Sequence, residues 1–297
     1  MATTATLKSM LRSGPMVIAP GAYDCLTARL VEQAGFPAVY MTGAGTSVSH
    51  GLPDYGLLTM TEMVANAGRM AATVGVPLIS DADTGYGNEL NVYRTVQSFE
   101  RAGVSAIHIE DQVFPKRCGH LDGKELVSRE DYAAKIRAAA AARRTADFLI
   151  IARTDARGVA GFDEAVARCN MALEAGADMA FFEAPQSVEE VAAVPRVVKG
   201  PCLFNNVLSG KTPAIPHLEI ERMGYRLAIV PGMLMSSIIG LCDKLLAELK
   251  ATGLTPATFS GGGPSVTFAR VGAADWDQRR TAFRDAGPPK TGRDAAE

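Results

Sequence analysis

The segment EDQVFPKRCGH, residues 110–120, places two carboxylates, two permanent cations, a cysteine and a histidine within one short stretch. Lys116 and Arg117 directly precede Cys118, and their positive field is expected to lower the pKa of the thiol and to attract an anionic substrate. Gly119 permits unusual backbone angles, which suit a flexible lid over an active site. The segment therefore predicts a lid that carries a reactive thiol to a bound substrate.

Two alternatives accompany this prediction. Cys118 could be an incidental surface thiol, and His120 could anchor the loop instead of contacting substrate. The remaining cysteines stand in apolar helical or strand contexts and are expected in the core; they are Cys25, Cys169, Cys202 and Cys242. An odd, scattered set without metal-binding spacing indicates reduced thiols in a cytoplasmic protein.

Residues of possible function, nearly all of them polar, also stand at the ends of several apolar, β-rich runs. They are Tyr40, Thr42, Gly43, Asp81, Asp83, Glu110, Asp111, Arg153, Asp155, Glu183, Asn205 and Asn206. Each acid alone is typical of a helix cap or a salt bridge, but several carboxylates at one edge would repel one another without a cation among them. Hard oxygen ligands without a histidine–cysteine cluster favour Mg²⁺ or Mn²⁺ over Zn²⁺.

Asp81 and Asp83 give the clearest metal signal. They stand two positions apart on one predicted strand, so both side chains are expected on the same face. Glu110 ends the next predicted strand and strengthens the signal. Because Mg²⁺ keeps several of its waters, some of these acids are expected to bind it through water.

Two further features are candidates for holding a substrate carboxylate. The stretch TGAGTSVSHG, residues 42–51, lacks the third glycine of a dinucleotide fingerprint and the Lys-Ser/Thr of a phosphate-binding loop. Its backbone amides could hold a carboxylate instead. Arg153 is suited to bidentate binding of a carboxylate. Alternatively, it forms a structural ion pair with Glu183 or Asp155, and the two roles are compatible.

The elements that position these residues repeat along the chain. Near-continuous apolar runs are typical of strands buried on both faces; they span 16–20, 38–43, 77–83, 106–111, 148–155, 179–184, 201–207 and 226–231. Amphipathic segments predict helices over 23–34, 60–74, 90–102, 129–144, 162–175, 187–198 and, less regularly, 214–223. Strand–helix units in this series predict a (β/α)₈ barrel of the TIM type, with its chemistry at the carboxyl ends of the strands. A doubly wound sheet is disfavoured because no glycine fingerprint follows the first strand.

The barrel is expected to form the catalytic domain, residues 1–251, and to end with a helix over 232–251. A Gly/Pro/Ser-rich linker and a weakly helical piece, about 266–285, form the C-terminal segment 252–285. Disorder is one alternative for this piece, but its Phe268, Val271, Trp276 and Phe283 indicate that it docks, for example on a neighbouring subunit. Residues 286–297 are predicted to be a disordered tail.

Composition narrows the function classes. The 297 residues are 47% hydrophobic and 21% charged, which is a globular composition with enough apolar material for a large core. A formal net charge of −2 gives no excess of basic residues that would favour binding to nucleic acid. Neither a signal-peptide core nor an apolar run long enough to span a membrane is present, so no membrane partner is expected.

The motif PKRCGH, residues 115–120, matches the K-[KR]-C-G-H lyase loop of the isocitrate lyase/phosphoenolpyruvate mutase superfamily, which the chain resembles over nearly its whole length. Supporting motifs are GLPDYG, DADTGYGN, IEDQ, ARTDA and FEA. The resemblance is greatest to members that cleave 2-methylisocitrate or dimethylmalate, or that act as carboxyphosphonoenolpyruvate mutases. It implies an α/β barrel, a requirement for Mg²⁺, and a homotetramer with a swapped C-terminal helix.

Carried over position by position, the resemblance implies that Asp83 is the nearest metal ligand and that Asp54, Asp81 and Glu110 hold waters of the metal. The implied substrate contacts are Tyr40, Thr42, Gly43, Ala44, Asp54, Lys116, Gly119, His120, Arg153, Glu183 and Asn205. Cys118 would be the general acid of a carbon–carbon lyase. Members that act on phosphonates often lack this cysteine, but carboxyphosphonoenolpyruvate mutase carries a very similar loop.

Two positions depart from the family pattern. Leu208, in NNVLSGKTP, replaces the usual acid, and Ser236 stands where tricarboxylate-cleaving relatives carry an arginine. A third substrate carboxylate would then lack its clamp. A 2-hydroxy dicarboxylate such as a substituted malate is therefore favoured over isocitrate or 2-methylisocitrate.

The predicted reaction is a Mg²⁺-dependent retro-aldol or Claisen cleavage of a 2-hydroxy di- or tricarboxylate to a 2-keto acid and a carboxylate. Tyr40 or a water of the metal would take the hydroxyl proton, Arg153 would stabilise the enolate-like fragment, and Cys118 would protonate it. The alternatives are a carboxyphosphonoenolpyruvate-type phosphonomutase, an oxaloacetate hydrolase or decarboxylase, and a non-catalytic barrel that acts as a binding protein.

Overall fold

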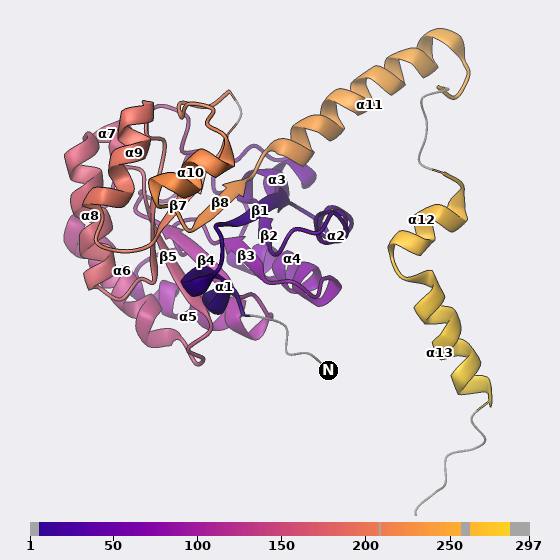
Figure 1. The fold of residues 1–297 in the computed structure, drawn as a ribbon, viewed down its shortest axis with the longest axis horizontal. Coiled ribbons are helices and arrows are strands. Elements are labelled where there is room, and N and C mark those ends of the chain that lie inside the picture. Colours follow the sequence, from indigo (N-terminus) through magenta and orange to yellow (C-terminus); the bar gives the residue numbers. More distant parts are fainter. Residues whose placement is uncertain (1–5, 208, 257–261, 286–297) are drawn as a thin grey trace, which may run out of the picture. The chain divides into compact units, whose positions relative to one another are not determined.

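The computed structural model describes residues 6–207, 209–256 and 262–285. Its parallel strands form a closed barrel in sequential order (Figure 1). The strands are β1 (Val17–Ala22), β2 (Val39–Met41), β3 (Leu78–Asp81), β4 (Ala106–Glu110), β5 (Leu149–Thr154), β6 (Met179–Phe182), β7 (Cys202–Asn205) and β8 (Leu227–Val230). Each strand overlaps the apolar run that predicts it, and the predicted (β/α)₈ barrel is confirmed.

Helices connect successive strands on the outside of the barrel (Figure 1). They are α2 (Cys25–Gln33), α4 (Met60–Thr73), α5 (Glu89–Arg101), α6 (Arg129–Ala142), α8 (Phe162–Glu174), α9 (Val188–Val197) and α10 (His217–Met223), with the additional short helices α1 (Leu7–Ser13), α3 (Gly43–Ser49) and α7 (Ala156–Val159). Reciprocal capping boxes start α2 at Asp24 and α4 at Thr59. None of the described helices is both long and apolar enough to cross a membrane.

Apolar side chains fill the barrel and surround it. One cluster of buried strand residues, including Ala19, Ile79, Ile151 and Leu203, also takes in Leu7 of α1. Other clusters pack strand residues against the surrounding helices. The strands are buried on both faces, which explains why their sequences are continuous apolar runs rather than alternating ones.

The connection from β4 to α6, residues 111–128, contains most of the segment 110–120 that is predicted to be a lid. It is called the lid below, and its opening and closing stay a prediction. Its two limbs are bonded to each other by their backbones. The Val113 N–H donates to the Glu125 carbonyl at 2.8 Å, and the Val127 N–H donates to the Asp111 carbonyl at 2.9 Å. The lid is therefore a closed loop with an ordered base.

Gln112 fastens this loop from the inside. It forms an antiparallel bridge with Leu126 on the opposite limb. Its side-chain amide donates to the Arg117 carbonyl at 2.8 Å, and its side-chain oxygen accepts the Arg117 N–H at 3.0 Å. These bonds link the base of the lid to the residue before Cys118.

One local prediction about the acids is wrong. β3 ends at Asp81, so Asp83 does not lie on the strand. The φ angle of Asp83 is +46°, in the left-handed region that residues other than glycine rarely adopt. The chain turns there, and the Asp83 N–H donates to Asp81 Oδ1 at 2.9 Å. The two carboxylates are brought together by this turn and not by strand alternation.

Contacts divide the chain into two compact units, Met1–Gly240 and Leu241–Glu297. The division falls within α11 (Met233–Thr252), the helix predicted over 232–251. The predicted domain boundary at residue 251 and the docking of segment 252–285 stay predictions.

The predicted helix over 266–285 is two helices, α12 (Pro264–Arg270) and α13 (Ala273–Asp285). Gly272 lies between them with a φ angle of +80°, which interrupts the helical backbone. The predicted disordered tail, 286–297, lies outside the described residues.

The cysteines predicted for the core divide into two groups. Cys169 and Cys202 are buried as expected. Cys25 is half-buried and Cys242 is exposed, so the prediction is wrong for these two. An apolar helical context therefore did not ensure burial.

Candidate active site

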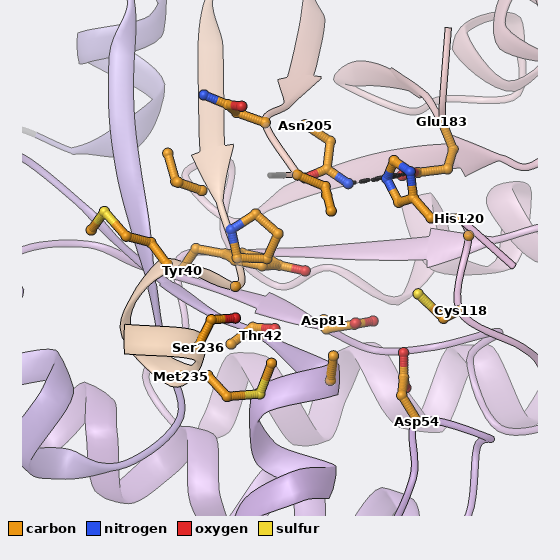
Figure 2. Close-up of a pocket in the computed structure, with 18 of the residues that line it drawn as sticks. Tyr40, Thr42, Asp54, Asp81, Cys118, His120, Glu183, Asn205, Met235 and Ser236 are labelled. Atoms are coloured by element: carbon orange, nitrogen blue, oxygen red, sulfur yellow. Dashed lines mark hydrogen bonds and ion pairs between the residues drawn. The ribbon is translucent and has the colours of Figure 1, made fainter. Parts of the chain in front are cut away.

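A cavity of about 460 Å³ lies at the carboxyl ends of the strands, where barrels carry their chemistry. Most of the predicted site residues line it: Tyr40, Thr42, Ala44, Asp54, Asp81, Lys116, Cys118, Gly119, His120, Arg153, Glu183 and Asn205. Figure 2 shows Cys118 and His120 on one side of the cavity, with Met235 and Ser236 on the other. Gly43, Asp83 and Glu110 are not among the lining residues, but they contact the lining residues Asp81, Lys116 and Arg153, respectively.

Lys116 of the lid lies between two carboxylates. Its Nζ is 2.5 Å from Asp54 Oδ1 and 3.0 Å from Asp83 Oδ1. Burial raises the pKa of Asp83 to about 6, although Lys116 opposes the shift. Burial also raises the pKa of Asp81. The single ammonium group of Lys116 therefore neutralises only part of the negative charge of these carboxylates.

Buried carboxylate oxygens indicate where a cation would fit. Both Oε atoms of Glu110 and the Oδ1 of Asp83 lack a well-aligned hydrogen bond within the described residues, although a cationic nitrogen lies about 3 Å from each carboxylate. Burial raises the pKa of Glu110 well above its ordinary value. Among the described residues, no three His, Cys, Asp or Glu side chains converge as a direct ligand set. The donors therefore fit a hard cation that is held by one or two carboxylates and several waters, as Mg²⁺ prefers.

Arg153 stands at the centre of three carboxylates. Its Nε is 2.9 Å from Asp155, 3.2 Å from Glu110 and 3.7 Å from Glu183. The guanidinium carbon also lies 5.1 Å from the centre of the Phe181 ring. The structural pairs considered from the sequence are therefore present, and Arg153 still lines the cavity.

His120 connects the lid to the far end of the barrel mouth. Its Nε2 is 2.8 Å from Glu183 Oε1, and its Nδ1 accepts the Lys211 N–H at 3.0 Å. Asn205 donates to the same carboxylate at 3.1 Å (Figure 2). Burial alone would raise the pKa of Glu183, but Arg153 and His120 hold it well below its ordinary range. These contacts favour the loop-anchor alternative for His120, and its contact with substrate stays a prediction.

The thiol of Cys118 differs from its prediction. Burial raises its pKa above the ordinary value, and the nearby carboxylates of Asp54 and Glu183 add to the rise. Arg153 and a backbone hydrogen bond at His120 oppose the shift without reversing it. The expected lowering by basic neighbours is wrong because Lys116 is paired with acids and because burial dominates. The thiol therefore keeps its proton at neutral pH.

Gly119 is needed for a reason that the sequence did not indicate. Its φ angle is not among the positive ones, so it does not supply an unusual backbone angle. A Cβ at this position would lie 2.3 Å from Arg153 Nη2 and 2.7 Å from Glu183 Cγ. Only glycine lets the lid approach Arg153 and Glu183 this closely.

Tyr40 is bonded to His108, a residue that is not among the predicted site residues. Its hydroxyl lies 2.8 Å from His108 Nε2, and both side chains are buried. Burial raises the pKa of Tyr40 well above its ordinary value, and burial lowers the pKa of His108 to about 3. A phenol that keeps its proton does not favour Tyr40 as the base. Strand alternation in AIHIE, which places His108 on the same face as Glu110, could have identified it.

Helix α3 occupies the glycine-rich stretch that was considered for carboxylate binding. Thr42 caps it by accepting the Gly45 N–H at 3.3 Å. A Cβ at Gly43 would lie 2.3 Å from Asp81 Oδ2, so the helix starts against this acid. Thr42 and Ala44 face the cavity, whereas Gly43 allows the close packing.

The wall opposite the acids is neutral. It is formed by the ends of β7 and β8 and the start of α11, with Val207, Val230, Pro231, Gly232, Met233, Met235, Ser236 and Ser237. Only Ser236 among these is singled out by the sequence. None of these described lining residues is a lysine or arginine. Leu208, the other departure from the family pattern, lies outside the described residues.

Comparisons with known proteins agree with this geometry. The family model described as phosphoenolpyruvate phosphomutase matches residues 7–250. A 2,3-dimethylmalate lyase of Eubacterium barkeri is 50% identical over 232 residues, which cover 78% of this chain and 80% of the relative.

Solved structures are similar over nearly the whole chain. An oxaloacetate acetylhydrolase in complex with the inhibitor 3,3-difluorooxalacetate superimposes with a TM-score of 0.91 at 36% identity, covering 96% of this chain and 98% of the other. A phosphonopyruvate hydrolase in complex with oxalate and Mg²⁺ superimposes with a TM-score of 0.83 at 31% identity, covering 94% and 97%. A relative with this barrel therefore holds a divalent cation together with a small dicarboxylate.

Proposed function

The chain belongs to the isocitrate lyase/phosphoenolpyruvate mutase superfamily, and from this premise we propose that it is a carbon–carbon lyase acting on a 2-hydroxy dicarboxylate of the substituted-malate type. The observation that carries the proposal is the position of Cys118, whose protonated thiol lines the same cavity as Arg153 and Asp81. A buried thiol with a raised pKa is suited to donating a proton. The similarity to a 2,3-dimethylmalate lyase supports the same reaction class.

The acidic side is assigned to a divalent cation, Mg²⁺ or alternatively Mn²⁺. Asp83, Asp81, Glu110 and Asp54 would hold it, directly or through water. When bound, the cation would polarise the 2-hydroxyl and the adjacent carboxylate of the substrate. The buried carboxylate oxygens without well-aligned hydrogen bonds support this assignment.

The bond between C2 and C3 of the substrate breaks as the 2-hydroxyl passes its proton to a base. Because the raised pKa of Tyr40 does not favour the phenol, a water held by the carboxylates of the acidic side is assigned as this base. C2 becomes the carbonyl of a 2-keto acid, and negative charge develops on the carboxylate fragment that contains C3. Arg153, held rigidly by Asp155, is placed to stabilise that charge. Cys118 donates its proton to C3, and the lid keeps competing water away during this step.

Substrate choice is assigned to the neutral wall. Ser236 offers a hydroxyl where a third carboxylate would need a cation. Met235 and Val207 offer apolar surface to alkyl substituents of the substrate. These contacts support a substituted malate over 2-methylisocitrate.

A substrate panel tests the proposal. The protein is incubated with Mg²⁺ and with malates substituted at C2 or C3, and released pyruvate or glyoxylate is reduced by lactate dehydrogenase and NADH. We expect 2-methyl-substituted malates to yield pyruvate and 2-methylisocitrate to react more slowly. Absence of any 2-keto acid across the panel would contradict the proposed function.

Oxaloacetate hydrolysis is a second candidate, because the oxaloacetate acetylhydrolase structure superimposes closely. Proton NMR of oxaloacetate with the protein and Mg²⁺ distinguishes it, since hydrolysis gives acetate and oxalate without pyruvate. A phosphonomutase would instead be detected by phosphorus-31 NMR with phosphoenolpyruvate-type substrates.

We further propose that the protein is a homotetramer in which the C-terminal segment docks on a neighbouring subunit. Large apolar side chains of α12 and α13 are exposed: Phe268, Trp276 and Phe283. Exposed aromatic residues at such density are typical of interfaces. Light scattering of the full chain and of a Trp276→Glu variant tests this, and an unchanged mass would contradict it.

A further inference from the structure

Lys124 is a buried cation of the lid that the proposed reaction does not use. Its side chain is only 2% exposed, although it belongs to a long connecting loop. Its Nζ is 2.9 Å from Asp155 Oδ1 and also donates to the Gly119 carbonyl. Helix α7 covers it, because a Cβ at Gly158 would lie 3.4 Å from the ammonium nitrogen. The ammonium group is therefore held in one place by partners from two different elements.

Both partners belong to the candidate active site. Gly119 directly follows Cys118 and packs against Arg153. Asp155 accepts the Arg153 Nε–H at 2.9 Å. Lys124 thus joins the peptide next to the thiol to the carboxylate that orients the guanidinium.

Lys124 supplies a second cation to the carboxylates around Arg153. Glu110, Asp155 and Glu183 face this guanidinium, so one cation meets three carboxylates. Burial alone would raise the pKa of Asp155, but Arg153 and then Lys124 outweigh it and hold the pKa below its ordinary value. Without Lys124, the Asp155 carboxylate would keep only Arg153 as a cationic partner among the ion pairs of the described residues.

We propose that Lys124 is a positioning residue that seats the lid. It holds the Gly119 carbonyl so that the Cys118 thiol faces the cavity, and it shares Asp155 with Arg153 so that the seated lid and the oriented guanidinium form one unit. The proposal rests on the lyase function, since that function requires the thiol to stand at the cavity. Lys124 acts on the site through its contacts with Gly119 and Asp155 and not by contacting substrate.

Cysteine labelling tests the proposal without any substrate. Lys124→Met removes the charge and the donors but keeps a side chain of similar length. Alkylation of each cysteine by iodoacetamide is followed by peptide mass spectrometry. We expect the rate at Cys118 to rise roughly tenfold, because the lid opens locally more often.

Lys211→Met is the matched control. Lys211 forms an exposed ion pair with Asp122 of the same lid, with an N–O distance of 2.6 Å. Loss of such a pair has little effect in water, so the Cys118 rate should change by less than about twofold. The Lys211 N–H that bonds His120 is retained in this variant.

Cys169 and Cys202 separate lid opening from general loosening, because both are buried away from the lid, in α8 and in β7. Their labelling should stay slow in Lys124→Met. An unchanged rate at Cys118, or an equal acceleration at all three thiols, would overturn the proposal. If Lys124→Met does not fold, Lys124→Gln, which keeps one donor for the Gly119 carbonyl, is tested by the same criteria.

Steady-state kinetics on the cleaved substrate give a second readout. Lys124→Met should lower kcat more than it raises KM, and Lys124→Arg should recover part of kcat, because Arg153 orientation affects the transition state more than substrate binding. A rise in KM alone would contradict the positioning role. A failed substrate panel would leave the labelling result standing, whereas an unchanged labelling rate would overturn the role of Lys124 and leave the lyase proposal intact.

Discussion

The two sides of the cavity are built in different ways. On the side of the lid and β5, each ionised group is held by partners, as Lys116 is by Asp54 and as Arg153 is by Asp155. On the side of β8 and α11, side chains such as Met235 and Ser236 present neutral surface to the same cavity. Figure 2 shows the two sides facing each other.

This difference separates two tasks. Ionised groups that are fixed before the substrate arrives can stabilise developing charge without reorganising. Neutral side chains discriminate by shape and by the absence of a counter-charge, which gives smaller energy differences. Changes on the charged side should therefore affect the rate strongly, and changes on the neutral side should affect the choice of substrate.

Removal of the proton donor should give the largest effect. Cys118→Ala is expected to lower kcat by roughly a thousandfold, since general acid catalysis contributes about 10²- to 10⁴-fold. Mg²⁺ binding, measured by calorimetry, should be unchanged. Cys242→Ala, which alters an exposed thiol, is the control. Near-normal turnover of Cys118→Ala would show that Cys118 is not the general acid.

Arg153→Lys should follow in size. A lysine retains the charge but cannot bond Asp155 through two nitrogens as Arg153 does, so kcat is expected to fall by roughly 100-fold. Arg157→Lys is the matched control, because Arg157 pairs with Glu190 outside the cavity lining. Equal effects of the two variants would show that the charged side is not preorganised for catalysis.

Asp83→Asn tests the acidic part of the charged side. Loss of one carboxylate should raise the Mg²⁺ dissociation constant by roughly tenfold to 100-fold, measured by isothermal titration calorimetry without substrate. Asp122→Asn, which changes an exposed lid acid, should leave it unaltered. If the affinity of Asp83→Asn for Mg²⁺ is unaltered, the cation site does not include Asp83.

Ser236→Arg tests the neutral side. The new cation should raise the ratio of kcat/KM for 2-methylisocitrate to that for a substituted malate by about tenfold, because it can pair with a third carboxylate. Ser236→Ala removes the hydroxyl without adding charge and should leave the ratio near its original value. A loss of both activities without a change in the ratio would count against the neutral wall as the selective side.

The smallest effect concerns the pH dependence of the thiol. Because the pKa of Cys118 is raised, the protonated form persists above the ordinary value of 9.0. Iodoacetamide alkylation of Cys118 should therefore increase with pH through a midpoint above that value, and kcat should not decline between neutral pH and this range. A midpoint below pH 9.0 would instead show that the basic neighbours lower the pKa of the thiol, as expected from the sequence.

The fold could be predicted because its signal is local. Strands buried on both faces leave continuous apolar runs, and polar residues at their ends must meet at one mouth of a barrel. Asp81, Glu110 and Arg153 were found in this way, and they lie together at the mouth.

The remaining details depend on contacts between distant residues. The turn at Asp83 and the burial of Cys118 follow from packing that no spacing rule contains. Lys124 looks like an ordinary loop lysine until the fold brings Asp155 to it. Gly272 could have been recognised as a helix break, since glycine weakens a helix interior.

The bonded base of the lid has a consequence for the order of events. Because backbone hydrogen bonds join the limbs at Val113 and Val127, segment 111–128 should swing as one rigid unit about its two ends. Lys116 and Cys118 would then leave and return together. An outward swing would uncover the carboxylates of Asp54 and Asp83 for arriving ligands, and an inward swing would bring Lys116 and the thiol back to the cavity together. If the segment moves in this way, ligand loading should precede proton delivery, and one movement should set the order of both.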